Sequence, residues 1–442
     1  MSSLHDKTLT AVFAKDRQIL QSTRIPIVTV SGTFGEDLKK WYGLKNENIS
    51  TDIVFSRAHF SMAYAAVTAA WGEEINQKKA WLVDPTNFVS SQKWRNITMT
   101  EQIGKILART PILKTLKDLI DKFGRNKLPI LNSITPPLLY LFEDVHQPIL
   151  CFHIAAGNIL AQLGKTVVQV ITDPHVREDY LIHASLPNLH YCVFDEETKF
   201  EALEKAFMNG VDLDPDRVIV TGPPIDQRII DARKQKKYDT KKPLKILITT
   251  GGLGTNKSEI HDILEQLLPT LHHKEQKYEL MLYAGTQKDF VDLGKRLGKE
   301  HRVKVNVIDK IAADSPKQNN TNSLTILYHP QIFDANEILI KYGFPWADCV
   351  VTKPSGDMAY DAAAAGCFLI TLKPWGVWEE RIEEIFWQKG IARKAEIDKI
   401  VRQFEILERI GWIKSAQEAV QELEPLYLNG ISKIIKTVKS LT

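Results

Sequence analysis

The stretch Val350-Val-Thr-Lys-Pro-Ser-Gly-Asp-Met-Ala-Tyr-Asp361, followed by four alanines and Gly366, decides the fold of the second half of the chain. It predicts a short buried strand over residues 349–352, a break at Pro354-Ser-Gly356 and an alanine-rich helix. Such a turn presents backbone N–H groups at the start of a helix, where the helix dipole stabilises an anion. The arrangement suits a phosphate, although any strand–helix unit with a small-residue helix needs a similar turn.

Acidic side chains follow this turn. Asp361 lies within the predicted helix, and the next strand-like run, Phe368–Pro374, leads to the pair Glu379-Glu380. Backbone amides for phosphates and carboxylates for sugar hydroxyls together favour a nucleotide diphosphate as ligand.

Size and composition set the broad class. The chain has 442 residues, 44% hydrophobic and 25% charged, which favours a globular protein of two domains. A formal net charge of +3 is too small to indicate nucleic acid. The four cysteines are scattered without a Cys-x-x-Cys pair, so neither a disulfide framework nor a zinc site is predicted.

Targeting signals are not evident in the sequence. The N-terminal residues carry no apolar h-region, and no apolar run approaches the length of a membrane span. We therefore expect a cytoplasmic protein.

Strand-like runs alternate with helical patterns along most of the chain, which predicts an α/β fold with parallel sheets covered on both faces. The polar, basic segment 231–243 is predicted to link a first domain, residues 1–230, to a second, residues 244–424. Residues 425–442 place isoleucines on one face and lysines on the other, which predicts an amphipathic helix. Beyond Gly390 we expect only helices.

Specific elements follow from the same periodicities. The strands predicted for the first domain are Ile25–Ser31, Asp52–Ser56, Ala80–Val83, Ile149–His153, Val167–Thr172, His190–Phe194 and Arg217–Thr221. Those of the second, besides residues 349–352, are Leu244–Thr250, Tyr278–Tyr283, Val303–Ile308, Leu324–Tyr328 and Phe368–Leu372. The predicted helices include Phe60–Trp71, Pro111–Phe123, Ala155–Leu163, Thr198–Asn209 and Ser258–Leu268.

A second glycine-rich junction, Thr249-Thr-Gly-Gly-Leu-Gly-Thr-Asn-Lys257, opens the second domain. It follows a strand and precedes a helix, so it could surround a phosphate or serve as a plain turn. Its spacing is neither that of a P-loop nor Gly-x-Gly-x-x-Gly. Because ligands of open α/β sheets bind beyond the carboxyl ends of the strands, this loop and the turn at Lys353 are expected to face one crevice.

Several side chains of the first domain could act as acids or bases. His59 stands between a predicted strand and an alanine-rich helix, where it could be a general base or a structural residue. Asp173 and His175 follow the end of a predicted strand. They could form an acid/base pair or bind a metal, or Asp173 could simply cap the loop. Asp84 and His153 occupy similar positions. The Gly222-Pro-Pro turn is predicted to be structural.

Taken together, these segments resemble GT-B glycosyltransferases of family 28, the group that includes MurG and the diacylglycerol glycosyltransferases. Lys353–Asp361 resembles the family's Lys-x-Gly-x-x-Thr-x-x-Glu donor signature, and Pro374–Glu380 its Pro-Gly-Gln-Glu element. Val218–Ile225 resembles the family's Val-Thr-Gly-x-Pro-Val, and Ser56–Ala63 the histidine loop that begins the acceptor-side domain.

The resemblance implies two Rossmann-like domains that face a cleft, with C-terminal helices packing back across them. It also implies inverting transfer from a UDP-sugar to a hydroxyl acceptor. The donor residues would be Gly251, Gly252, Gly254, Lys353, Ser355, Gly356, Asp357 and Met358 for the diphosphate, Asp361 for the ribose, and Glu379 and Glu380 for the sugar. His59, or else Asp173, would act as general base.

The resemblance implies no metal and no tightly bound cofactor, because helix and side-chain charges neutralise the diphosphate. A lipid acceptor and peripheral membrane contact are compatible with the basic amphipathic segment 111–123, which could equally cover the sheet. Two alternatives remain open. Asp361 and Met358 replace the Glu and Thr of the signature, which is compatible with a non-catalytic nucleotide-sugar-binding relative, and a UDP-sugar 2-epimerase would share the fold.

Overall fold

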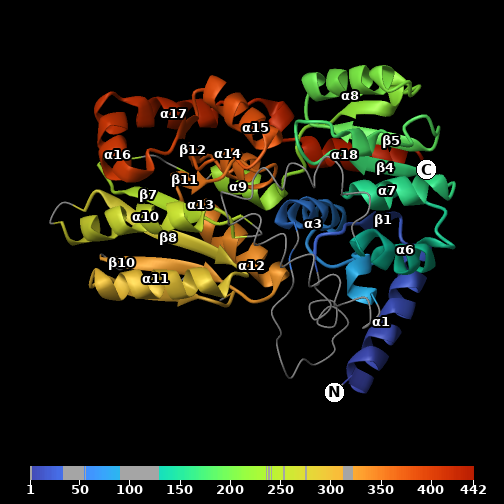
Figure 1. Cartoon of the computed structure of the whole chain (residues 1–442), viewed down its shortest axis with the longest axis horizontal. Helices are drawn as coiled ribbons and strands as arrows, with labels where there is room; N and C mark the ends of the chain where they lie inside the picture. The colour runs from blue at the N-terminus through green and yellow to red at the C-terminus, as the bar shows by residue number, and fades with distance from the viewer. Residues whose placement is uncertain are drawn as a thin grey trace. The chain divides into compact units, whose positions relative to one another are not determined.

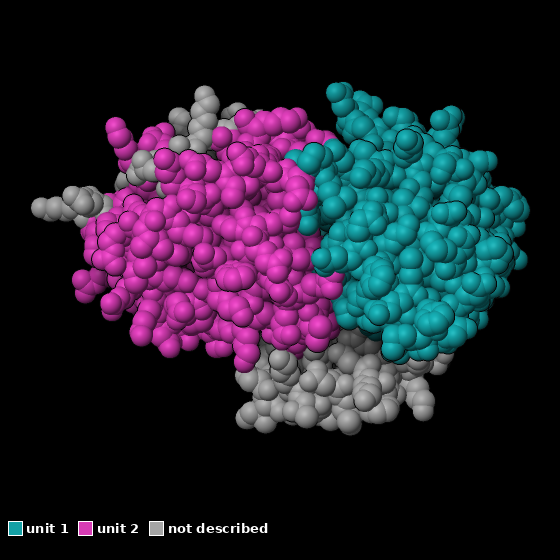
Figure 2. Space-filling model, turned by 90° about the horizontal axis from the view of Figure 1, so that it is seen from above, with its two compact units in different colours: residues 1–48, 53–226, 425–442 teal, residues 49–52, 227–424 magenta. Residues whose placement is uncertain are grey.

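The computed structural model describes residues 2–32, 54, 56–89, 129–234, 236, 239, 241–251, 254–273, 276–311 and 322–442. The chain forms two compact units, shown in teal and magenta in Figure 2. Unit 1 comprises residues 1–48, 53–226 and 425–442, and unit 2 comprises residues 49–52 and 227–424. Each is a parallel sheet with helices packed on it (Figure 1), which confirms the predicted α/β class.

Unit 1 contains a six-stranded parallel sheet in the order β2-β1-β3-β4-β5-β6. The strands are β1 (Ile25–Val28), β2 (Ala80–Val83), β3 (Ile149–Cys151), β4 (Val167–Val170), β5 (Leu189–Val193) and β6 (Val218–Val220). Its helices include α1 (Ser2–Ser22), α3 (Arg57–Trp71), α6 (Pro129–Phe142), α7 (Ile154–Gln162), α8 (Glu196–Met208) and α18 (Gly430–Ser440). The inner strands are almost fully buried, as expected for a sheet covered on both faces.

The strand predicted at residues 25–31 is confirmed as β1 (Ile25–Val28), which pairs with both β2 and β3. Its continuous apolar sequence suits a strand buried on both faces. Most of residues 52–56 and all of the predicted helix Pro111–Phe123 lie outside the described residues; Val54 forms only an isolated antiparallel bridge with Gly32.

Unit 2 contains a seven-stranded parallel sheet in the order β13-β12-β11-β7-β8-β10-β9. The strands are β7 (Leu244–Thr249), β8 (Tyr278–Gly285), β9 (Lys304–Ile308), β10 (Ser323–Tyr328), β11 (Cys349–Thr352), β12 (Phe368–Thr371) and β13 (Ala392–Lys394). The helices are α9 (Gln227–Lys234), α10 (Lys257–Leu267), α11 (Lys288–Glu300), α12 (Ile332–Ile338), α13 (Phe344–Trp346), α14 (Met358–Ala364), α15 (Val377–Gln388), α16 (Ile400–Arg409) and α17 (Trp412–Gln421).

Strand β13 corrects the expectation that the chain is wholly helical beyond Gly390. Ala392 to Lys394 pair with β12 at the edge of the sheet, and only Ala392 is fully buried. An edge strand with two charged residues lacks the apolar run by which the inner strands are predicted.

The order of strands changes direction once in each sheet. In unit 1, β2 lies beside β1 on one side of the switch, and β4, β5 and β6 lie beyond β3 on the other. In unit 2, β8, β10 and β9 lie on the β7 side of the switch, and β12 and β13 lie on the β11 side. Such a switch point opens a crevice beyond the carboxyl ends of the two strands, where ligands of open α/β sheets bind. The chain therefore has two positions at which a site is expected, one in each unit.

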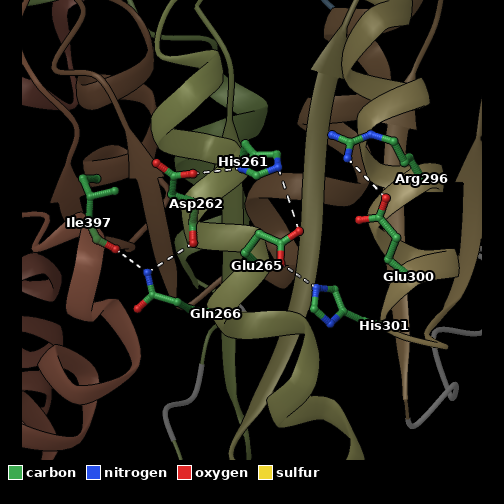
Figure 3. A network of polar contacts seen from close by, with 8 residues as sticks. All are labelled: His261, Asp262, Glu265, Gln266, Arg296, Glu300, His301 and Ile397. Carbon is green, nitrogen blue, oxygen red and sulfur yellow. Dashed lines mark hydrogen bonds and ion pairs between the residues drawn. The ribbon is translucent and has the colours of Figure 1, made fainter.

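Polar contacts on helix α10 hold the outer layer of unit 2 together (Figure 3). The Glu265 carboxylate lies 2.9 Å from Nε2 of His301, at the end of α11, and 3.9 Å from Nε2 of His261. The Gln266 amide donates to the Ile397 carbonyl at 2.5 Å and accepts the Ile400 N–H at 3.1 Å. Gln266 thus satisfies the start of α16, whose first N–H groups have no partner within the helix.

Helix α18 belongs to unit 1, although it follows the whole of unit 2 in the sequence. It packs on α3, and its first residue, Gly430, lies against the Gly222-Pro223 turn that follows β6. A Cβ atom at Gly430 would lie 2.1 Å from the Pro223 carbonyl oxygen, so only glycine permits this approach.

Gly430→Ala is therefore expected to destabilise unit 1 by about 1–3 kcal/mol, as overpacking against backbone does. Chemical denaturation followed by circular dichroism would measure this loss. Ser432→Ala, an exposed position of the same helix, is the matched control and should change the free energy of unfolding by less than about 0.5 kcal/mol. Equal effects of the two substitutions would contradict the assigned close packing.

Candidate functional site

The two loops predicted to face one crevice meet at the switch point of unit 2. Gly251 follows β7, Lys353 follows β11, and these strands are neighbours in the sheet. A Cβ atom at Gly251 would lie 2.7 Å from Cε of Lys353, so the lysine stem passes directly over the glycine. Gly254 adopts φ +63° and donates its N–H to the Gly251 carbonyl at 2.7 Å, which closes the loop. Gly252 lies outside the described residues.

A buried ion pair lies beside this contact. Lys353 Nζ is 2.5 Å from Oε1 of Glu379, whose side chain is 2% exposed. The other oxygen, Oε2, accepts the Trp375 N–H at 2.7 Å, and the lysine ammonium stands 5.7 Å from the centre of the Trp375 ring. Glu379 was predicted as a sugar ligand. In the structure it holds Lys353 and the loop after β12, while its neighbour Glu380 is exposed.

The Lys353–Asp361 turn is more closely bonded than the sequence indicates. Ser355 Oγ donates to Oδ1 of Asp357 at 2.7 Å and accepts the Met358 N–H at 3.3 Å. Ser355 N–H is bonded to the Lys353 carbonyl. Asp357 and Asp361 are both 5% exposed. Two of the N–H groups predicted to be available to an anion are therefore used within the turn.

Two pairs of residues at this edge were not predicted from the sequence as part of the site. The hydroxyls of Thr249 and Thr255, on either side of Gly251, are buried and have no hydrogen-bond partner among the described residues. The rings of Trp375 and Trp378 pack edge to face on either side of Gly376, with centroids 6.5 Å apart. The two threonines lie near Gly251, and the two tryptophans flank Gly376. A threonine or tryptophan close to a loop glycine is the sequence signal that could have indicated them.

At the unit 1 switch point the structure brings two imidazoles together. His59 lies in the first turn of α3, whose N-cap Ser56 accepts the His59 N–H at 3.3 Å. His153 follows β3 and is the N-cap residue of α7. The two rings lie edge to face with centroids 5.4 Å apart. His59 and His153 therefore belong to one cluster at the carboxyl edge of the sheet, although they are 94 residues apart in sequence (153 minus 59).

The Asp173–Arg177 loop is fixed from α8. His175 Nδ1 lies 2.8 Å from Oε1 of Glu201, which also contacts Lys205 at 2.8 Å. Glu201 Oε2 accepts the Val176 N–H at 2.9 Å. His175 is thus bonded to a carboxylate that sequence analysis did not consider. Asp173 lies near Tyr180, whose pKa is raised to about 12 by burial and further by the charge of Asp173.

The Glu201 cluster predicts a pH dependence of stability. Burial raises the pKa of Glu201, but hydrogen bonds from His175, Lys205 and Val176 outweigh it and lower the pKa from 4.5 to about 2. Because the folded-state pKa lies below the unfolded one, the stabilisation is complete above pH 4.5 and is lost as the pH falls toward 2. Glu201→Gln should cost about 3 kcal/mol at pH 7 and remove this pH dependence, as urea denaturation at several pH values would show. Glu204→Gln, exposed on the same helix, should do neither.

Asp84 has a structural role in unit 1. It is fully buried, and its carboxylate accepts the N–H groups of Ser31 (2.7 Å), Gly32 (3.1 Å) and Thr86 (3.0 Å) together with the Ser31 and Thr86 hydroxyls. Burial raises its pKa to about 6, against the lowering effect of these hydrogen bonds. Asp84 thus joins the exits of β1 and β2.

Within the described residues, no group of three or more His, Cys, Asp or Glu side chains could hold a metal ion. No helix of the described part of the chain is long and apolar enough to cross a membrane.

Comparison with known proteins identifies the architecture. A family model described as a domain of unknown function (DUF6938) matches residues 216–361, and no curated protein matches the sequence. The crystal structure of Os79 from O. sativa in complex with UDP superposes with a TM-score of 0.51 at 10% identity, covering 100% of this chain and 98% of that one.

Two further structures are similar at lower scores. MurG from Acinetobacter baumannii gives a TM-score of 0.47 at 12% identity, covering 94% of this chain and 99% of that one. UDP-GlcNAc 2-epimerase from Neisseria meningitidis, bound to UDP-GlcNAc, gives 0.48 at 13% identity, covering 94% and 100%. With its two parallel sheets of six and seven strands, the chain has the GT-B fold.

Proposed function

We propose that the protein is an inverting glycosyltransferase that moves a sugar from a UDP-sugar to a hydroxyl acceptor, with a lipid or another glycoconjugate precursor as the acceptor. The observation that carries this proposal is the meeting of the Gly251 and Lys353 loops at the unit 2 switch point. A phosphate-sized ligand there would find backbone amides, a fixed ammonium group and unpaired threonine hydroxyls. The GT-B fold supports the same reading, because Os79 of that fold binds UDP.

In this proposal unit 2 holds the donor. The Gly251–Gly254 loop and the Ser355–Met358 turn bind the diphosphate, Asp361 binds the ribose, and Glu380 binds a sugar hydroxyl. Glu379 acts indirectly, because its carboxylate fixes the Lys353 ammonium before the donor arrives. A positive charge that is already in place stabilises the negative charge developing on the leaving diphosphate without further reorganisation.

In the same proposal unit 1 supplies the base. His59, or alternatively Asp173, takes the proton of the acceptor hydroxyl as its oxygen attacks the anomeric carbon, and UDP leaves from the opposite face. The bond to the acceptor oxygen forms as the bond to the diphosphate oxygen breaks, which inverts the anomeric configuration. Proton transfer of this kind contributes about 10²–10⁴-fold to a rate.

Calorimetric titration with UDP and UDP-sugars tests the donor site. We expect UDP to bind, and Gly251→Val to weaken it at least tenfold, because the new side chain would displace Lys353. Glu380→Ala, at an exposed position, should leave UDP affinity unchanged and weaken only the UDP-sugar. Failure of every uridine nucleotide to bind would overturn the proposal.

Incubation with labelled UDP-sugars and a lipid extract tests the reaction. Transfer of label to lipid is the expected result, and His59→Ala should abolish it while leaving UDP affinity intact. An isomerised UDP-sugar formed without acceptor would indicate a 2-epimerase. Nucleotide binding with neither product would indicate a non-catalytic relative.

A further inference from the structure

Helix α8 of unit 1 carries the most exposed apolar side chains in the part of the chain that the structure describes. It packs on β5 and β6, at one edge of the sheet, and lies at the top of unit 1 in Figure 1. Phe200, Phe207 and Met208 are 68%, 85% and 76% exposed, more than any other large hydrophobic residue described. Single exposed apolar residues are common on protein surfaces, but three on one helix form a patch that requires an explanation.

The helical period places glutamates on the same face as the two phenylalanines. Phe200 and Phe207 are seven residues apart, which is about two turns of the helix. Glu204 lies between them, four residues after the first and three before the second, and Glu196 lies four residues before Phe200. Glu196 and Glu204 are exposed, and neither makes an ion pair with any residue that the structure describes.

The two lysines of α8 lie away from this face. Lys199 and Lys205 stand one and two residues before the phenylalanines, and residues at these spacings do not face each other on a helix. Lys205 is also engaged, since its ammonium group lies 2.8 Å from Glu201 and donates to the Val176 carbonyl at 2.6 Å. The exposed face of α8 is therefore apolar and negatively charged, in a chain whose formal net charge is +3.

This combination of side chains distinguishes between the possible occupants of the face. An anionic membrane surface would repel the glutamates. A second copy of the chain that used the same face would bring like charges together, which is costly in an interface. A protein segment that carries apolar side chains flanked by lysines or arginines complements both the phenylalanines and the carboxylates.

We propose that α8 is the docking surface for a protein partner that presents a basic amphipathic helix. The apolar side of the partner helix packs on Phe200, Phe207 and Met208, as the side-chain ridges of one helix pack on another. Its cationic side chains reach Glu196 and Glu204 at the rim. Phenylalanine and methionine are among the residue types enriched in the cores of interfaces, and charges at the rim increase the association rate and the specificity.

A synthetic helical peptide of leucine and lysine, labelled with a fluorophore, tests the surface when its anisotropy is followed as the full chain is added. We expect saturable 1:1 binding, and no binding of a peptide with glutamate in place of lysine. Phe200→Ala combined with Phe207→Ala should lower the affinity about tenfold or more, because it removes the apolar anchors. Glu204→Lys should lower it about threefold or more, because it reverses a charge at the rim.

All three substituted positions are exposed, so these variants should keep the melting temperature of the parent protein. Matched controls lie at the opposite edge of the same sheet, in the loop before β2. Ile75→Ala removes an apolar side chain that is 52% exposed, and Glu74→Lys reverses an exposed carboxylate. Neither control should change the affinity for the peptide.

Four results would overturn the proposal. Two concern the peptide: no binding, or the same loss of affinity in the control variants as in the α8 variants. The third is binding of phosphatidylglycerol vesicles that the double phenylalanine variant loses, which would assign the face to a membrane. The fourth is a dimer in sedimentation that the same variant dissociates, which would assign the face to a second copy of the chain.

Discussion

Replacing Lys353 by methionine is expected to lower the free energy of unfolding by about 3–5 kcal/mol, the cost of leaving one partner of a buried ion pair alone. Glu379 is almost completely buried, and without Lys353 its Oε1 would lose its charged partner at 2.5 Å. Only the Trp375 N–H would remain on that carboxylate among the contacts seen. Urea denaturation at pH 7 measures the effect.

Two further variants separate this effect from a general loss of charge. Lys353→Met combined with Glu379→Gln should recover most of the stability, because the stranded charge is gone. Lys389→Met removes a lysine whose partner, Glu424, is 60% exposed, and should cost less than about 1 kcal/mol. A loss for Lys353→Met as small as that for Lys389→Met would show that the pair is not held as the structure indicates.

Asp84→Ala should cost a similar amount, about 3–5 kcal/mol, in unit 1. The substitution removes the acceptor from three buried N–H groups, and each buried donor left unpaired costs about 1–3 kcal/mol. Asp84→Asn should be intermediate, since its amide keeps one oxygen but turns an NH₂ group toward donors. Thermal and urea unfolding of both variants would establish the order.

A helix cap provides the comparison for Asp84. Asp195 caps α8 by accepting the Thr198 N–H at 2.7 Å and the Thr198 hydroxyl at 2.6 Å. Asp195→Ala should therefore cost about 1 kcal/mol, as an ordinary N-cap does. If Asp84→Ala costs no more than Asp195→Ala, then Asp84 does not join the exits of β1 and β2.

Most of the strands predicted from the sequence are fully buried, because a continuous apolar run is a sufficient signal for them, although the predicted strands β6 and β9 are partly exposed. Some elements with mixed surroundings were not predicted. Helix α1 buries Asp16, which accepts the Trp81 Nε1–H at 2.8 Å, so a charge interrupts the face that packs inward. Without knowledge of Trp81, 65 residues away, nothing in the sequence marks Asp16 as buried.

The candidate site shows the same division. The rule that ligands of open α/β sheets bind beyond the carboxyl ends of the strands is sufficient to predict that the Gly251 and Lys353 loops face one crevice. The role of Glu379 could not be predicted in this way. Its partner lies 26 residues earlier, and a glutamate after a strand is compatible with a sugar ligand until its burial is known. The contact of His59 with His153 likewise depends on how two helices begin.

The position of α18 bears on the order in which the chain acquires structure during synthesis. Apart from residues 49–52, unit 2 is one continuous stretch, whereas unit 1 needs residues 425–442 to complete the packing on α3. Domains generally fold as units as they leave the ribosome. Unit 2 can therefore mature first, while unit 1, although translated earlier, waits with the α18 surface of α3 uncovered. Mutations that slow translation or folding of unit 2 should prolong that exposure and increase the demand of the nascent chain for chaperones.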